Sequence, residues 1–218
     1  MENRSLIVCR SLELAREGRV LLEATDFSIA AGERVLITGS SGCGKSTLLR
    51  CFCLLDPGGE RSVLFKGRPI GDWPVTTLRS AVAYLPQTPV MVEGSVRDNL
   101  CLALSLKAHR GLSFDDGQLK AGLDSVALEL SLDADAQRLS PGEKARVALL
   151  QRLMLKPELL LCDEPIAALD EENAEIVAGL LVNAGAEGMA QVVVSHQPLS
   201  GFQGQHYHFV NRRLERVP

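Results

Sequence analysis

The sequence predicts one α/β domain that combines an antiparallel β-rich part, a parallel-sheet core and a helical insertion. Short β-like runs crowd the first 65 residues, whereas later apolar runs alternate with stretches long enough to form helices. Such an alternation is typical of a parallel sheet covered by helices on both faces. The segment from about 95 to 140 carries helix signals and little strand signal, which predicts the insertion.

The N-terminal part contains four β-like runs that are joined by turns. These runs lie at residues 5–12, 27–29, 35–38 and 62–65, with turns at 16–19 and 31–33. Alternating apolar and polar residues between turn-forming residues predict an antiparallel arrangement. We expect the β-rich part and the core to occupy about residues 1–94 and 141–218 of a single 218-residue domain, and the helical part residues 95–140.

The core is predicted from three near-continuous apolar runs, which are typical of central strands buried on both faces. They lie at residues 82–85, 159–162 and 191–195. Helices are predicted where Leu, Ala, Val and Glu recur at helical spacing. These segments are residues 45–53, 96–105, 117–128, 142–155 and 171–184.

Composition and charge exclude several classes of protein. The chain has 23 Lys and Arg, 27 Asp and Glu and 46% hydrophobic residues, which is the profile of a globular domain rather than a disordered or fibrous one. A formal net charge of −4 provides no general attraction to nucleic acid, so we expect no such partner. No run of about 18 apolar residues and no secretory signal is found. We therefore expect a cytoplasmic chain without direct membrane insertion.

The cysteines and histidines do not form a recognisable metal pattern. The six cysteines are scattered without a C-x-x-C pair, which predicts reduced, mostly buried thiols. His206 and His208 could place two imidazoles on one face of a strand, but no third ligand is nearby in the sequence, so a structural role is favoured. The cysteines are Cys9, Cys43, Cys51, Cys53, Cys101 and Cys162.

The most specific local pattern is a glycine-rich loop between a predicted strand and a predicted helix. It matches G-x-x-x-x-G-K-[ST] with both flanks present, which excludes a chance glycine turn. Glycines let backbone N–H groups wrap a phosphate, and the helix N-terminus adds its positive dipole end. We predict that Lys45 reaches the β- and γ-phosphates and that the Ser46 hydroxyl holds Mg²⁺. The loop consists of Gly39, Ser40, Ser41, Gly42, Cys43, Gly44, Lys45, Ser46 and Thr47.

Two adjacent acids, Asp163 and Glu164, end the apolar run at 159–162. Because side chains alternate along a strand, the two carboxylates are expected to point in different directions and to serve different roles. Asp163 suits the Mg²⁺ shell, and Glu164 could polarise an attacking water. On its own the pair would fit an exposed turn before Pro165 equally well. The phosphate loop, which needs a metal ligand, favours the functional interpretation.

A helix start is predicted at Ser140-Pro141-Gly142-Glu143. Ser140 is a good N-cap, Pro141 suits the first helical position, and Glu143 closes a capping box. Taken alone, this segment is more often a capped helix and nothing else. Its free backbone donors could also bind a phosphate through Ser140 and Gly142.

Taken together, these motifs resemble the nucleotide-binding subunit of an ATP-binding cassette (ABC) ATPase, a P-loop NTPase family, across nearly the whole chain. A lone histidine or glutamine at such positions is more often structural or solvated, but the family-like order favours function. The matching features are a Walker A loop at 39–47, a Q-loop glutamine Gln87, a signature segment at 139–143, Walker B at 159–163 with Glu164 after it, a D-loop Ala168-Leu169-Asp170 and a switch histidine His196.

The resemblance implies an ATPase whose two copies dimerise head to tail when ATP is bound. Each ATP would lie between the Walker A loop of one copy and the signature helix of the other. Ser140, Gly142 and Glu143 of the partner copy, with Asp170 of the D-loop, would complete the ATP site.

Hydrolysis is assigned by the same resemblance to residues around the γ-phosphate. Glu164 would orient or deprotonate the water, and His196 would contact the γ-phosphate. Gln87 would touch Mg²⁺ or the water, and Mg²⁺ would be held by Ser46 and Asp163. The implied ligands are therefore ATP and Mg²⁺.

The sequence departs from the family pattern at two positions. Pro141 stands where the family usually has glycine, which deletes one backbone donor and predicts weaker or slower dimerisation. Family members commonly place an aromatic residue that stacks on adenine near residues 15–17, where this chain has none. We expect the Arg16 guanidinium to stack on the base instead, with less selectivity for adenine.

The likeness also implies a separate transmembrane permease, which would hold this chain at the cytoplasmic face of a bacterial inner membrane. Residues 87–100 resemble the stretch that receives the permease in exporter-like cassettes. Val90, Met91 and Val92 are expected either to form an exposed apolar docking patch or to be buried against the helical insertion. A softer likeness, to small bacterial cassettes, includes those that export iron or other metals.

Two other functions stay open on the sequence. One is a non-transport ABC ATPase in DNA repair, translation or iron–sulfur assembly, which coiled-coil insertions or tandem cassettes would favour. The other is an ATP-gated scaffold with little turnover, against which Glu164 argues.

Overall fold

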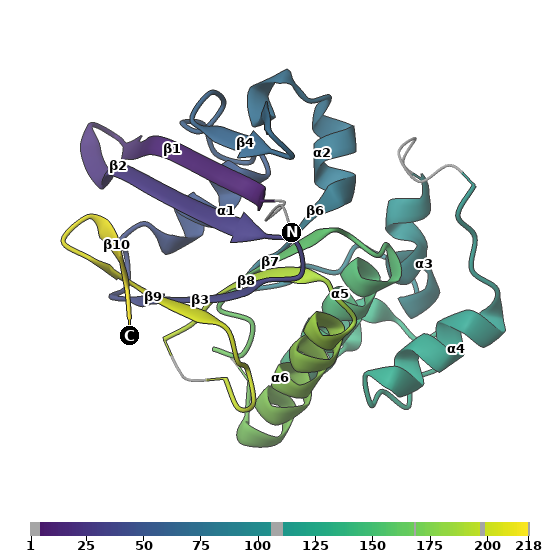
Figure 1. Cartoon of the computed structure of the whole chain (residues 1–218). Helices are drawn as coiled ribbons and strands as arrows, with labels where there is room; N and C mark the ends of the chain where they lie inside the picture. Colours follow the sequence, from purple (N-terminus) through teal and green to yellow (C-terminus); the bar gives the residue numbers. More distant parts are fainter. Residues whose placement is uncertain (1–4, 106–110, 168, 197–198, 218) are drawn as a thin grey trace.

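Two β-sheets carry the strands of the computed structural model, which describes residues 5–105, 111–167, 169–196 and 199–217 (Figure 1). The first sheet is antiparallel with the order β2-β1-β4-β5. Its strands are β1 Ser5–Arg16, β2 Arg19–Ala30, β4 Val63–Phe65 and β5 Arg68–Pro69.

The second sheet has the order β10-β9-β3-β8-β7-β6, and all its neighbouring strands are parallel except the hairpin of β9 and β10. The carboxyl ends of β3, β7 and β8 therefore meet at one edge, which is where α/β sheets bind ligands. Its strands are β3 Arg34–Gly39, β6 Val82–Leu85, β7 Leu159–Asp163, β8 Ala190–Val194, β9 Gln205–Val210 and β10 Arg213–Arg216.

Helices cover both faces of the second sheet. Helix α1 packs between the two sheets, whereas α5 and α6 lie against the opposite face with α3 and α4 beside them (Figure 1). The α-helices are α1 Lys45–Phe52, α2 Val75–Ala81, α3 Val96–Cys101, α4 Asp116–Ser125, α5 Pro141–Met154 and α6 Glu171–Ala186. The 3₁₀ turns are η1 Ile70–Asp72, η2 Leu102–Ser105 and η4 Ala136–Arg138.

Strand alternation divides the apolar side chains between two cores. Leu159 and Leu161 of β7 join the core around α1, while Leu160 and Cys162 face the core beneath α5 and α6. Each of these four side chains is fully buried. Because a strand sends successive side chains to opposite faces, a continuous apolar run is needed to fill both cores. The predicted α/β fold with its antiparallel and parallel sheets is therefore confirmed.

Several elements differ from the sequence prediction. Strand β2 begins at Arg19, far before the predicted residue 27, because it pairs with β1 through alternating buried and exposed residues. Helix α3 ends at Cys101 and continues as a 3₁₀ turn. Helix α2 and the β9–β10 hairpin were not predicted. The hairpin turns at Asn211 and Arg212, both with positive φ, which is the geometry of a tight two-residue turn.

The candidate docking patch is only partly exposed. Val90 is 83% exposed and Val92 40%, but Met91 is 7% exposed and packs in the core beneath α5. The exposed-patch alternative thus holds for Val90 and Val92, and the burial alternative holds for Met91. The division of the chain near residues 95 and 140 stays a prediction.

Within the described residues, no helix combines the length and the apolar character that crossing a bilayer requires.

Four of the six cysteines are buried, and Cys43 and Cys101 are partly exposed. Burial raises the pKa of Cys51 to about 12 and that of Cys53 to about 11, so both remain protonated, unreactive thiols at neutral pH.

Candidate active site

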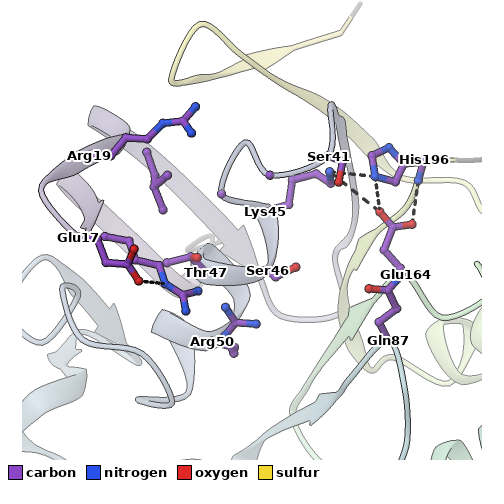
Figure 2. A pocket seen from close by; sticks show the side chains of 14 residues that line it. Glu17, Arg19, Ser41, Lys45, Ser46, Thr47, Arg50, Gln87, Glu164 and His196 are labelled. Atoms are coloured by element: carbon purple, nitrogen blue, oxygen red, sulfur yellow. Dashed lines mark hydrogen bonds and ion pairs between the residues drawn. The ribbon is translucent and has the colours of Figure 1, made fainter.

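A cavity of 520 Å³ opens where β3, β7 and β8 end (Figure 2). The glycine-rich loop forms its floor, Glu164 and His196 lie at one end, and Glu17 and Arg19 lie across from them. The sequence-predicted residues that line it are Arg16, Ser41, Gly42, Gly44, Lys45, Ser46, Thr47, Gln87, Glu164 and His196.

The loop takes its shape from glycines that no other residue could replace without strain. Gly39 has φ of 154° and a Cβ there would lie 2.7 Å from the Phe209 carbonyl oxygen. Gly44, with φ of 119°, is the N-cap of α1 and offers no side-chain cap to the helix. The first turn of α1 also contains no acidic residue. Its backbone N–H groups and dipole therefore favour an anion in the cavity.

Lys45 is 5% exposed and reaches along the loop. Its Nζ donates to the carbonyl oxygens of Gly39 and Ser40, each at 2.9 Å. Ser40 and Cys43 line a separate cavity of 210 Å³ behind the loop. The buried ammonium thus fixes the loop shape and faces the cavity as a positive charge.

Asp163 connects the loop to the sheet through two hydroxyl groups. Its Oδ1 accepts a hydrogen bond from Ser46 at 2.9 Å, and its Oδ2 accepts one from Tyr84 at 2.9 Å. The donor set of a hydroxyl and a carboxylate is the oxygen chemistry that Mg²⁺ prefers. Ser46 and Asp163 therefore fit a magnesium ion bound beside a phosphate.

Glu164 and His196 form the other charged end of the cavity (Figure 2). Glu164 Oε1 lies 3.0 Å from His196 Nε2 and 4.0 Å from Lys45 Nζ, and Oε2 accepts from the His196 backbone N–H at 3.1 Å. Glu164 is 6% exposed and has a left-handed backbone with φ of 49°. The two carboxylates have different partners, as expected, but the expected cause does not apply, because β7 ends at Asp163 and Glu164 lies beyond the strand.

Gln87 and the arginines complete the wall. Gln87 is exposed and lies beside Glu164 in the view of Figure 2. At the far end Arg16 and Arg19 flank the β1–β2 turn, and Leu21 adds the apolar surface. This end could hold a base, while the loop and Glu164 face the phosphates.

The signature residues lie apart from this cavity. Ser140 caps α5 and forms the predicted capping box, since Glu143 N–H donates to Ser140 Oγ at 3.3 Å and Ser140 N–H donates to Glu143 Oε2 at 2.8 Å. These bonds lower the pKa of Glu143 below its ordinary value. Pro141 occupies the first helical position as predicted.

Gly142 brings the signature helix against α6. A Cβ on Gly142 would lie 2.6 Å from the Asn173 side chain, which in turn donates to Asp170 Oδ1 at 2.7 Å. Asp170 caps α6, and these bonds lower the pKa of its carboxyl. Ala168 of the expected D-loop lies outside the described residues.

His206 and His208 share a face of β9, the arrangement that the sequence left open. Their ring nitrogens lie 2.8 Å and 3.0 Å from the Thr38 hydroxyl oxygen. This contact supports the structural interpretation. Among the described residues, no group of three or more His, Cys, Asp or Glu could hold a metal ion.

Comparison with known proteins places this geometry in a family. The family model described as ABC transporter matches residues 22–167 of the chain. The chain belongs to the ABC transporter family. The match includes the Walker A loop and Walker B strand of the cavity, so the chain is an ATPase domain of the ABC type, which binds ATP.

Relatives and a solved ABC structure agree with this assignment. The Escherichia coli (strain K12) protein named "Probable iron export ATP-binding protein FetA" is 35% identical over 173 residues, which are 79% of this chain and 76% of that protein. The ABC-type transmembrane transporter verA of Clonostachys rogersoniana is 33% identical over 189 residues. Those residues are 84% of this chain but 15% of verA, so the chain spans a small part of that relative.

The fold is shared with cbiO1 from Clostridium perfringens, which is described as part of the ABC transporter complex cbiONQ. The TM-score is 0.80 at 24% identity, with 97% of this chain and 87% of that chain covered. At this identity the likeness concerns the fold alone.

Sequence reasoning did not single out several residues of the site, among them Arg19 and Leu21, which line the cavity. Tyr84 contacts Asp163, Arg50 lines the cavity, and Asn173 packs on Gly142. Tyr84 could have been found, because a tyrosine carries the only polar side chain in an otherwise apolar run. Asn173 gave no such signal, because its role depends on the packing of two helices.

Proposed function

We propose that this chain is the ATP-hydrolysing subunit of an ABC transporter, driving a separate membrane permease through ATP-dependent head-to-tail dimerisation. The observation that carries the proposal is the meeting of Lys45, Glu164 and His196 at one end of the cavity, within 4.0 Å of each other. A phosphate-binding lysine beside a buried carboxylate and an imidazole is what hydrolysis of a γ-phosphate requires.

The residues divide the chemistry between them. Lys45 and the N-terminus of α1 bind the phosphates and stabilise negative charge. Glu164, held by His196, orients a water and accepts its proton, for which a positioned carboxylate supplies about 10²- to 10⁴-fold. His196 Nε2 lies 3.0 Å from Glu164 Oε1 and 3.3 Å from Lys45 Nζ, so the imidazole is placed where it could contact a phosphate oxygen. Gln87 lies where it can contact the same water.

Ser46 and Asp163 would hold Mg²⁺, and Gln87 could add a further oxygen. When bound, the ion neutralises charge on the β- and γ-phosphates. The hydrogen bond between Ser46 and Asp163 supports this assignment, because it holds the Asp163 oxygen 2.9 Å from the hydroxyl of Ser46, which lines the cavity.

Dimerisation would explain why some of the predicted ATP-binding residues do not line the cavity. Ser140 and Asp170 are exposed N-caps of neighbouring helices, and Glu143 belongs to the same capping box. On this chain the four residues Ser140, Gly142, Glu143 and Asp170 are not among those lining the cavity. A second copy, placed head to tail, would bring its own set to the ATP held here. Loss of the γ-phosphate would remove those contacts and reopen the pair.

A groove lined by Pro86, the residue before Gln87, suits the permease. It measures 600 Å³ and is lined mainly by apolar atoms and by Arg79 and Arg152. Leu55 and Leu102, which line it, are 44% and 45% exposed. An amphipathic helix with an acidic end would match this mixture of apolar walls and arginines. Such docking would hold the chain at the cytoplasmic face of a membrane.

The narrower form of the proposal is export of iron or another metal. Its support is the likeness to FetA, whose printed name states iron export. The residues of the cavity recognise ATP, so the cargo would be selected by the permease.

The variant Glu164→Gln tests hydrolysis in a single-turnover experiment with excess protein. ATP binding should persist while hydrolysis falls by at least about 100-fold, the lower end of the effect of a positioned base. Glu187→Gln, at an exposed glutamate after α6, is the matched control and should hydrolyse ATP like the parent. Equal rates in parent and Glu164→Gln would refute the assignment.

Co-purification from detergent-solubilised membranes tests transport separately. A membrane protein retained by the tagged parent chain supports the permease. A chain that hydrolyses ATP but retains no membrane protein would indicate a soluble ABC ATPase instead.

A further inference from the structure

Tyr84 touches both the proposed docking groove and the proposed magnesium site. It lies in the middle of β6, where its side chain is half-buried and lines the 600 Å³ groove. Its hydroxyl donates to Asp163 Oδ2 at 2.9 Å. One side chain therefore lines the groove and contacts the carboxylate of the proposed magnesium site.

Asp163 is fixed from two sides by these contacts. Tyr84 holds one oxygen, and Ser46 in the first turn of α1 holds the other at 2.9 Å. The carboxylate is 3% exposed, so solvent cannot replace a lost partner easily. Without the tyrosine hydroxyl, Oδ2 would lose a partner in a buried place and the carboxylate could rotate away from Ser46.

The backbone of Tyr84 also contacts another residue that lines the groove. Arg152, another groove-lining residue, donates from Nε to the Tyr84 carbonyl oxygen at 3.2 Å. Tyr84 also pairs with Leu161 on β7, two residues before Asp163. A group that enters the groove would press on the tyrosine ring or on Arg152, and either displacement reaches the hydroxyl.

Burial, together with the charge of Asp163, raises the pKa of Tyr84 well above its ordinary value. The hydroxyl is the donor of the hydrogen bond to Asp163. Arg50 interacts with the same hydroxyl, and its Nε pairs with Asp56 at 2.9 Å.

We infer that Tyr84 is a positioning residue that orients Asp163 for magnesium binding and transmits occupation of the groove to the metal-binding pair. The inference rests on the proposed function, because it assigns Mg²⁺ to Ser46 and Asp163 and a permease to the groove. Tyr84 touches neither ATP nor the metal; it acts through Asp163. Residues that orient a metal ligand typically contribute about 10- to 100-fold to metal affinity.

Tyr84→Phe tests the first half, because it removes the hydroxyl and keeps the ring in the groove. Binding of Mn²⁺ to the ATP-bound chain, followed by electron paramagnetic resonance, should weaken by about 10-fold or more. ATP affinity measured with excess chelator should stay unchanged. Tyr207→Phe is the matched control, since its hydroxyl donates to Gln205 at 2.9 Å, away from Asp163, and it should bind Mn²⁺ like the parent.

Unchanged Mn²⁺ affinity in Tyr84→Phe would overturn the inference, and so would an equal loss of metal-free ATP binding, which would indicate a structural role. If the parent binds Mn²⁺–ATP but does not hydrolyse it, the proposed function is wrong. The Mn²⁺ affinities of the parent and of Tyr84→Phe would still test the role of Tyr84.

Ala103→Trp tests transmission by adding bulk to the groove wall. The substitution should alter Mn²⁺ affinity in the parent and leave it unaltered in the Tyr84→Phe background, as a double-mutant cycle requires for coupled residues. Equal shifts in the two backgrounds, or no shift in either, would show that the groove does not act through Tyr84.

Discussion

At the scale of single residues, the site depends on where β7 ends. Asp163 is the last strand residue, and the left-handed backbone of Glu164 follows it. The Glu164 N–H still bonds to the Val194 carbonyl at 2.9 Å, so the turn stays attached to β8 and to nearby His196. The two adjacent acids therefore have different partners, Ser46 for Asp163 and His196 for Glu164. Sequence reasoning predicted different directions from strand alternation, but it did not predict that the strand ends at Asp163.

Arg16→Ala tests recognition of the base. We expect the affinity for ATP to fall about 2- to 30-fold, because a guanidinium over an aromatic face contributes about 0.5–2 kcal/mol. Arg19, which lines the same end of the cavity, offers a second variant with the same expected direction. Equilibrium binding of ATP and GTP to each variant provides the measurement.

Arg10→Ala is the matched control for Arg16→Ala, because Arg10 is an exposed arginine of β1 that does not line the cavity. Its affinity should equal that of the parent. If Arg16→Ala also binds ATP like the parent, stacking by Arg16 is wrong.

The residues that sequence reasoning missed have a common physical origin. The hydroxyl of Tyr84 stands out in an apolar run, but periodicity does not predict which residue that hydroxyl contacts. The bond to Asp163 joins residues 79 positions apart in the chain. Only the pairing of β6 with β7 brings them together.

At the scale of elements, helix α5, which begins at the signature segment, has one feature that the sequence predicts and one that it does not. The capping box of Ser140 and Glu143 was predictable because it needs only residues three apart. Its packing on α6 was not, because Gly142 meets Asn173 across two helices. Likewise β9 and β10 escaped prediction: their burial is partial and their residues are mostly polar, so no apolar run marks them.

Pro141→Gly tests the effect of the missing backbone donor in α5. We expect steady-state ATP turnover to rise about 2- to 10-fold, because one recovered hydrogen bond is worth about 0.5–1.5 kcal/mol. The same change should lower the free energy of unfolding by about 0.4–1 kcal/mol, since glycine gives the unfolded chain more freedom.

Pro74→Gly, at the exposed N-cap of α2, controls for the change in stability. It should lose similar stability and keep the parental turnover. Unchanged or lower turnover in Pro141→Gly would argue against a limiting role for the proline.

At the scale of the whole molecule, the two cores separate the functions. The core around α1 supports the glycine-rich loop, and the core beneath α5 and α6 supports the signature helix. Residues that line the groove belong to both cores, with Val82 in the first and Ala83 in the second. The parallel sheet lies between them and contributes side chains to both. A displacement at the groove therefore reaches the ATP cavity through the strands, with β6 and β7 as the shortest route.

Leu55→Asp tests the groove as the permease surface. Leu55 is 44% exposed and lines the groove, so a carboxylate there should disrupt an apolar contact with the permease. We expect retention of a membrane protein by the tagged chain to fall by at least about 10-fold, equivalent to about 1.4 kcal/mol. The free energy of unfolding should change by no more than about 0.5 kcal/mol, as is usual for surface positions.

Leu112→Asp separates a specific surface from a general effect of added charge. Leu112 is 46% exposed, lies before α4 and is not among the residues lining the groove. Its retention of the membrane protein should match that of the parent, because the permease would not touch it. Equal losses in the two variants would mean that net charge, rather than the groove, governs the association. If Leu55→Asp retained the membrane protein fully, the groove would be excluded as the docking surface. The exposed Val90 and Val92, on the segment that follows Gln87, would then be the favoured docking surface.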